Sequence, residues 1–194
     1  MNNYPSLFRS DSHDWHNNAC LNFMPDMSYG YIEGYLRAGD ILVDYVNEQA
    51  SGQDVLVYPI IFCYRHHLEL RMKEIIKLGR NLLDGKGDYD DNHQLTVLWR
   101  DCRTIVLRVW AENEAPGELP LIDHFITELD RADSKSDGFR YWESTKRSGR
   151  TPNLEGIGHI NIRHFRDCMK AMTDFLGSAA LGISVYLEQS REVI

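Results

Sequence analysis

The chain places one arginine where its pattern of apolar residues predicts a buried helix face. Arg65 lies in a helix that the sequence predicts over about residues 54–83. On a helical wheel of about 100° per residue, five apolar side chains of that helix fall within about 60° of Arg65. These five are Ile61, Leu68, Met72, Ile76 and Leu83. Glu69 follows one turn later, at the i,i+4 spacing that lets two side chains on a helix meet. Because a guanidinium in an apolar seam is costly unless it is paired, the pattern predicts an Arg65–Glu69 ion pair.

Two interpretations of this pair stay open. In the structural one, Arg65 and Glu69 neutralise each other and reach a backbone carbonyl. In the functional one, Arg65 and Glu69 form the floor of an anion- or nucleotide-binding pocket with His66 at its rim. A planar guanidinium suits that role because it offers paired donors to a phosphate.

A second candidate site lies in the long irregular segment between about Arg131 and Gly158. From residue 140 to residue 150 it carries four basic residues against one acid, a local reversal in a chain of net charge −8. The basic residues are Arg140, Lys146, Arg147 and Arg150, and the aromatic residues beside them are Phe139, Tyr141 and Trp142. Basic groups interleaved with aromatic rings can hold phosphates and stack bases, which predicts a ligand site on Arg140, Tyr141, Arg147 and Arg150. The alternative is a solvated loop whose aromatic side chains dock on the rest of the protein.

Catalytic and metal-binding residues are less well defined. For catalysis the sequence offers only His66, Arg150 and His159 as candidates. His159 and His164 are five residues apart, and not at the i,i+4 spacing that places two ligands on one helix face. We therefore expect neither a bound metal nor a cofactor.

Helical periodicity supplies the elements that must position these residues. It predicts helices over about residues 28–50, 54–83, 93–110 and 120–130, and Ser28 can cap the first. The apolar side of that first helix is predicted to carry Tyr31, Ile32, Tyr35, Leu36, Ile41, Leu42 and Tyr45. The one stretch that resembles a strand is Phe139–Trp142. The fold class is therefore all-α, a single-domain bundle of about five helices with one long loop before the last.

The last helix has the clearest pattern. Its apolar residues are spaced 3, 4, 3, 4, 3, 4, 3, which is a heptad seam. They are Ile162, Phe165, Met169, Met172, Leu176, Ala179, Ile183 and Tyr186. The seam fits a bundle or a two-chain coiled coil, and Leu181 and Val185 lie off it. We expect the apolar segment Phe175–Leu187 to form a homodimer contact.

Composition limits the class of protein. With 43% hydrophobic and 26% charged residues, the 194-residue chain is an ordinary globular protein. It has neither a membrane-spanning run nor a signal peptide, and its four cysteines form no CxxC pair, so we expect reduced thiols and a cytoplasmic location. The predicted organisation is an irregular segment over 1–27, docked through Trp15, Phe23 and Met24, and a helical domain over 28–190.

The segment Tyr58–Lys73, YPIIFCYRHHLELRMK, resembles the central helix of bacterial HEPN-like (higher eukaryotes and prokaryotes nucleotide-binding) proteins. Leu98-Trp99 and Phe139-Arg140-Tyr141 resemble an uncharacterised bacterial subgroup, and the resemblance covers about residues 28–190. It implies a helical bundle, often dimeric, that binds nucleotides or RNA in toxin–antitoxin or phage-defence systems.

Active HEPN members cleave RNA without metal, through an arginine and a histidine separated by four to six residues. That spacing occurs here only between Arg9 and His16, in the irregular segment, and eight residues separate Arg150 from His159. The resemblance therefore implies the fold and a binding role. The third hypothesis is a metal-independent ribonuclease with a degenerate motif, in which Arg150 pairs with His159 or His66.

The leading hypothesis is a HEPN-like protein that binds a nucleotide or RNA. The alternative is a non-catalytic helical interaction protein, such as an immunity or scaffold protein with a protein partner, in which Arg65 is structural. Whether Arg65 faces a cleft or a closed core distinguishes the two.

Overall fold

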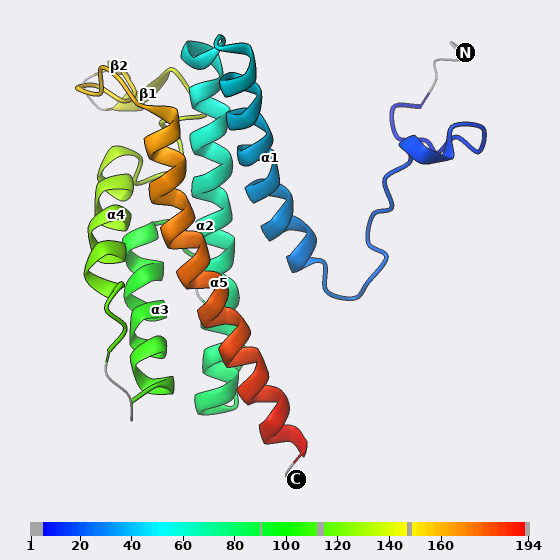
Figure 1. Ribbon diagram of the computed structural model, residues 1–194, viewed down its shortest axis with the longest axis vertical. Helices are drawn as coiled ribbons and strands as arrows, with labels where there is room; N and C mark the ends of the chain where they lie inside the picture. Colours follow the sequence, from blue (N-terminus) through cyan, green and yellow to red (C-terminus); the bar gives the residue numbers. More distant parts are fainter. Residues whose placement is uncertain (1–5, 90, 112–114, 147–148, 193–194) are drawn as a thin grey trace.

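The computed structural model describes residues 6–89, 91–111, 115–146 and 149–192, and these contain five α-helices (Figure 1). The helices are α1 (Ser28–Gln49), α2 (Gln53–Asp84), α3 (Leu95–Val109), α4 (Leu119–Ala132) and α5 (Ile162–Glu192). The strands β1 (Glu143–Lys146) and β2 (Gly149–Pro152) form a small antiparallel hairpin between α4 and α5. The prediction of an all-α bundle with one long loop before the last helix is confirmed.

Helix α2 lies at the centre of the bundle. It packs against α1, α3 and α5, and its buried residues spread around most of the helix, because three helices contact it. One face, with Leu70, Glu74 and Lys77, is half-buried or exposed. Gly79 marks the closest approach of α2 to α3, since a Cβ added at that position would collide with the side chain of Ile105.

The heptad seam of α5 packs against other helices of the same chain. Its central residues Met169, Met172, Leu176 and Ile183 are buried, and α5 packs along α2 for much of the length of the bundle (Figure 1). The interpretation as a bundle seam is therefore confirmed. The homodimer contact expected on α5 stays a prediction, and the exposed apolar side chains of that segment are Leu181, which is 67% exposed, Val185 and Tyr186.

The start of the first helix differs from the prediction. Ser28 is the first helical residue and its side chain makes no cap; instead Asp26 accepts the backbone N–H of Ser28 at 2.8 Å. Hydrogen bonds from Ser28 and Lys77 lower the pKa of Asp26 to about 2. An aspartate two residues earlier therefore supplies the acceptor that we assigned to the serine.

The predicted apolar side of α1 is confirmed only in part: Ile32 is buried, and Leu36 and Leu42 pack against the core. Tyr31, Ile41 and Tyr45 are exposed, while Val43 and Val46 are buried against α2. Because α1 lies at the edge of the bundle, it buries only a narrow stripe, and the sequence gives it more apolar residues than that stripe can cover.

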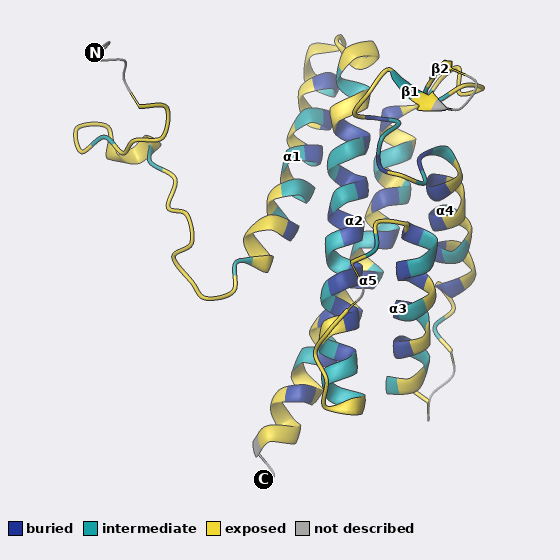
Figure 2. Cartoon of the chain, turned by 180° about the vertical axis from the view of Figure 1, so that it is seen from behind, coloured by how far each residue is buried: buried dark blue, intermediate teal, exposed yellow. Residues whose placement is uncertain are grey.

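Residues 6–27, here called the arm, do not dock. The arm contains a short 3₁₀ helix, Trp15–Asn17, and leads away from the bundle before α1 begins (Figure 1). The predicted docking residues Trp15, Phe23 and Met24 are exposed, so that prediction was wrong, and Figure 2 shows the arm in the exposed colour almost throughout.

The stretch Phe139–Trp142 is a turn rather than a strand. The backbone N–H groups of Arg140 and Tyr141 both donate to the carbonyl of Asp137, which bends the chain before β1 begins at Glu143. Phe139 docks in the core, as the alternative interpretation of the aromatic loop requires, whereas Trp142 is 82% exposed.

Candidate functional site

Arg65 lies in a closed core. Its side chain is 0% exposed and donates three hydrogen bonds within the protein. The acceptors are Glu69 Oε2 at 3.3 Å, the carbonyl of His93 at 2.9 Å and the carbonyl of Asp133 at 3.2 Å. The predicted Arg65–Glu69 ion pair is confirmed, together with the predicted contact to a backbone carbonyl. The guanidinium also ties α2 to the segment before α3 and to the segment after α4.

Glu69 is the acceptor on which this network converges. Its Oε1 lies 3.1 Å from Lys73 Nζ and 2.7 Å from His93 Nδ1, and its other oxygen meets Arg65. Burial alone would raise the pKa of Glu69, but the hydrogen bonds from His93 and Lys73 and the charge of Lys73 outweigh burial and hold that pKa below its ordinary value. Glu69 is therefore a buried carboxylate that stays charged.

His93 is the residue that the sequence did not point to. It precedes α3 and lies 24 positions from Glu69 along the chain, so no helical spacing relates the two. The sequence did indicate that Arg65, a charge in an apolar seam, needs more partners than Glu69 alone. It did not indicate which residues these partners are.

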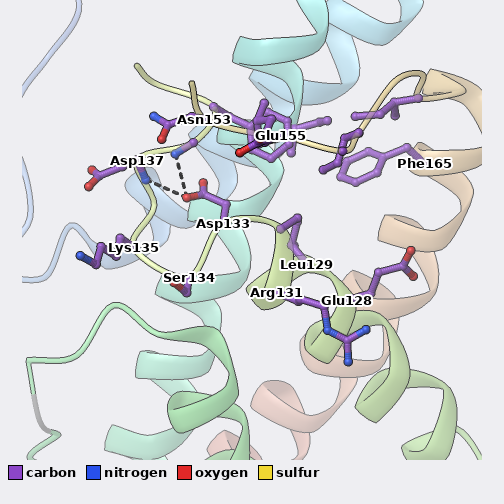
Figure 3. Close-up of a pocket in the computed structure, with 18 of the residues that line it drawn as sticks. Glu128, Leu129, Arg131, Asp133, Ser134, Lys135, Asp137, Asn153, Glu155 and Phe165 are labelled. Atoms are coloured by element: carbon purple, nitrogen blue, oxygen red, sulfur yellow. Dashed lines mark hydrogen bonds between the residues drawn. The ribbon is translucent and has the colours of Figure 1, made fainter. Parts of the chain in front are cut away.

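Asp133 shapes the start of the long loop. Its Oδ1 accepts the backbone N–H groups of Asp137 and Gly138, both at 2.8 Å, and its Oδ2 lies 3.8 Å from Arg65 Nε. That Oδ2 atom is buried and has no hydrogen-bond partner among the described residues. One aspartate therefore connects the buried network to the loop (Figure 3).

His66 belongs to a different surface from Arg65. Its ring lies edge-on to Tyr35 at 4.4 Å and stacks on Phe62 at 5.7 Å between ring centroids. Arg140 in turn lies over the rings of Phe62 at 5.7 Å and Tyr141 at 5.4 Å. Burial lowers the pKa of His66, so the ring is neutral at pH 7. The structure thus brings the predicted residues His66, Arg140 and Tyr141 together, through Phe62.

The predicted basic residues of the loop have acidic neighbours. Arg140 donates to the carbonyl of Ser136 and, at 2.9 Å, to Asp137, while Arg150 donates to Glu143 across the hairpin at 2.8 Å. Both arginines are nevertheless exposed. Arg147 lies outside the described residues.

His159 lines a groove between α4, the loop and α5, a site that the sequence did not predict. The groove has a volume of about 1130 Å³. Its lining mixes polar and apolar side chains, such as Glu128 and Lys135 beside Leu129 and Phe165 (Figure 3). Six of its apolar lining residues, here called the floor, are Ile61, Leu129, Phe139, Phe165, Met169 and Met172. All of these except Phe165 are buried. Among the described residues, no hydrogen bond or ion pair joins His159 to Arg150, nor His66 to Arg150, so the structure does not assemble the predicted acid–base pair.

The structure supports neither a reactive thiol in the groove nor a metal site. Cys168 lies in the groove with its Sγ 3.6 Å from His164 Nε2, but burial, helped by nearby carboxylates, raises the pKa of this thiol, which keeps it protonated. Over the part of the chain that the structure describes, no three His, Cys, Asp or Glu side chains are grouped as metal ligands.

No family model matches the chain, and neither a curated protein nor a solved structure is similar to it at a significant level. Among the described helices, none combines the length and the apolar character that crossing a bilayer requires.

Proposed function

We propose that this protein binds single-stranded RNA, or a nucleotide from it, on the surface formed by Arg140, Tyr141, Trp142 and Arg150, here called the hairpin surface. The observation that carries the proposal is the exposure of Trp142, 82%, two residues after the exposed Arg140 and one residue before the hairpin that carries the exposed Arg150. A large ring held in water at the start of a hairpin has no packing role, and it offers a face on which a base can stack.

The arrangement of Arg140 fits this role. Its guanidinium lies between the rings of Phe62 and Tyr141, and its contacts with Ser136 and Asp137 hold it in place. A pre-positioned guanidinium loses little freedom when it meets a phosphate, and its planar fork suits the phosphate oxygens. Because the whole chain has a net charge of −8, the attraction has to be local, which favours a short contact over a long basic track.

The resemblance to HEPN-like proteins agrees with this proposal. The proposal includes a cytoplasmic location and a role in a toxin–antitoxin or phage-defence system. Arg65 and Glu69 have no direct part in it, because the protein itself satisfies them.

The experiment is a titration of fluorescent ten-nucleotide poly-U and of UMP against the full chain at low and high salt. We expect Trp142→Ala to weaken RNA binding about tenfold or more at both salt concentrations, since stacking contributes about 1 to 3 kcal/mol per base. Trp15→Ala, which removes another exposed tryptophan, is the matched control and should bind as wild type.

Arg150→Ala should weaken binding mainly at low salt and reduce the salt slope by about 0.7, the value for one phosphate contact on a single strand. Arg108→Ala is its control, because Arg108 also forms an exposed ion pair, with Asp84, on another surface. Absence of binding to wild-type protein at low salt would contradict the proposal.

A second candidate is the helical interaction protein. Arg65 in a closed core is the geometry that this alternative requires, and the groove offers an apolar floor for a partner segment. Protein labelled with ¹³C at its methionine methyl groups tests it, because Met169 and Met172 line the floor. If neither signal moves when the apolar probe 8-anilinonaphthalene-1-sulfonate is added, the floor is closed to ligands and this candidate fails.

A further inference from the structure

The arm carries large apolar side chains that its own bundle does not cover. Leu7 and Phe8 are 87% and 90% exposed, and Leu21 and Phe23 are also exposed. Arg9 follows Leu7 and Phe8 and is the one lysine or arginine among residues 6–27. Isolated exposed apolar residues are common, but several of them on one short segment mark an interaction site.

The groove has the complementary chemistry. Its lining includes apolar side chains, and its volume, about 1130 Å³, is large enough for several more. Ile157 is a partly exposed apolar residue of its wall. Glu155 lines the same wall and is exposed, and no ion pair among the described residues includes it.

We propose that the arm of one copy occupies the groove of a second copy, with Leu7 and Phe8 on the apolar floor and Arg9 beside Glu155. This inference goes beyond RNA binding, because it names an assembly and the contacts that hold it. Two such contacts related by a two-fold axis would close a homodimer, since each copy gives one arm and offers one groove.

The position of the arm favours a second copy over the same chain. The arm joins α1 at the end remote from the hairpin, while the groove lies near the hairpin on the opposite side of the bundle, between α4 and α5 (Figure 1). To reach its own groove, the arm would have to cross the exterior of α1, α2 and α5.

The first experiment is light scattering of the full chain over a dilution series. We expect a mass near twice the 22.5 kDa of one chain, and Leu7→Ser combined with Phe8→Ser should weaken the dimer at least tenfold. These residues are exposed, so circular dichroism should show an unchanged fold. A wild-type monomer at about 100 μM would overturn the proposal.

Leu181→Ser combined with Val185→Ser is the matched control. This variant removes two exposed apolar residues from α5 and tests the other candidate dimer surface. We expect it to dimerise as wild type. If instead it abolishes the dimer while the arm variant does not, the contact lies on α5 and the arm proposal is wrong.

A charge exchange then tests whether the contact joins two chains. Arg9→Glu and Glu155→Arg should each weaken the dimer about three- to tenfold, because each places like charges together. An equimolar mixture should recover the wild-type affinity, since each arm then meets a groove of opposite charge. If the variants weaken the dimer but the mixture does not recover, each arm folds onto its own groove and the second-copy proposal fails.

Discussion

Two arginine–glutamate pairs in this protein have the same chemistry and opposite surroundings. Arg65 and Glu69 are enclosed in the core, where Arg65 has three acceptors and Glu69 has three donors. Arg150, which is 73% exposed, meets the half-buried Glu143 across the hairpin, and the two have only each other as partners among the described side chains. The difference shows that burial and the number of partners, rather than residue type, decide whether an arginine is part of the scaffold or available for a ligand.

The reason is the surrounding dielectric. Water screens the exposed pair, so its attraction is small and either partner can be given up to a ligand. Inside the core, each charge lost leaves another without solvation, so the buried network holds only while all its members are present.

The largest effect should come from breaking the buried pair. Replacing Arg65 or Glu69 alone with methionine should lower the free energy of unfolding by about 3 to 5 kcal/mol, because the remaining charge is stranded. Urea unfolding followed by circular dichroism measures this loss. The double variant should lose less than the sum of the two, by about 0.5 to 3 kcal/mol. Strict additivity would contradict a coupled pair.

A smaller effect is expected for a buried carboxylate without a cationic partner. Asp130 accepts the backbone N–H of Leu95 at 3.0 Å and the hydroxyl of Thr96 at 2.7 Å, and so holds the first turn of α3 against α4. Asp130→Ala should cost about 1 to 3 kcal/mol, the penalty for a buried donor left unsatisfied. Glu188→Ala, an exposed change on α5, should stay within about 0.5 kcal/mol by the same urea measurement.

Protonation of a buried histidine tests the same comparison in another way, because it places a new positive charge in the core. His67 is buried with its Nδ1 2.9 Å from the carbonyl of Ile32, and burial lowers its pKa below 6.5. Between the lowered pKa and 6.5, the unfolded chain binds more protons than the folded one, so stability should fall as pH falls below 6.5.

Urea unfolding at pH 7.5, 6.5 and 5.5 checks this dependence. His67→Asn keeps an amide donor near the Nδ1 position and removes the titration, so it should flatten part of the slope. His124→Asn, at an exposed position, is the control. An unchanged slope in the first variant would show that other groups cause the pH dependence.

The smallest effect should come from the exposed pair. Arg150→Ala or Glu143→Ala should change the free energy of unfolding by about 0.2 to 1 kcal/mol, and added salt should reduce the difference further. A loss as large as that at Arg65 would mean that the hairpin pair is structural and would weaken the case for an RNA-binding surface.

The sequence by itself determined the helices and the contacts within them. The Arg65–Glu69 pair and the seam of α5 follow from side chains three or four residues apart, whose proximity is fixed once a helix forms. The break between α1 and α2 is equally local, since Gly52 adopts a φ of 83°, where a residue with a side chain would be strained.

Only the tertiary structure decided what surrounds those pairs. His93 and Asp133 reach Arg65 from 28 and 68 residues away, and Arg140 meets Phe62 across a comparable distance in sequence. The groove is likewise formed by α4, the loop and α5 together. No spacing rule relates such residues, because their approach depends on how whole helices and the long loop pack. Whether Arg65 faced a ligand or a closed core was therefore settled by packing.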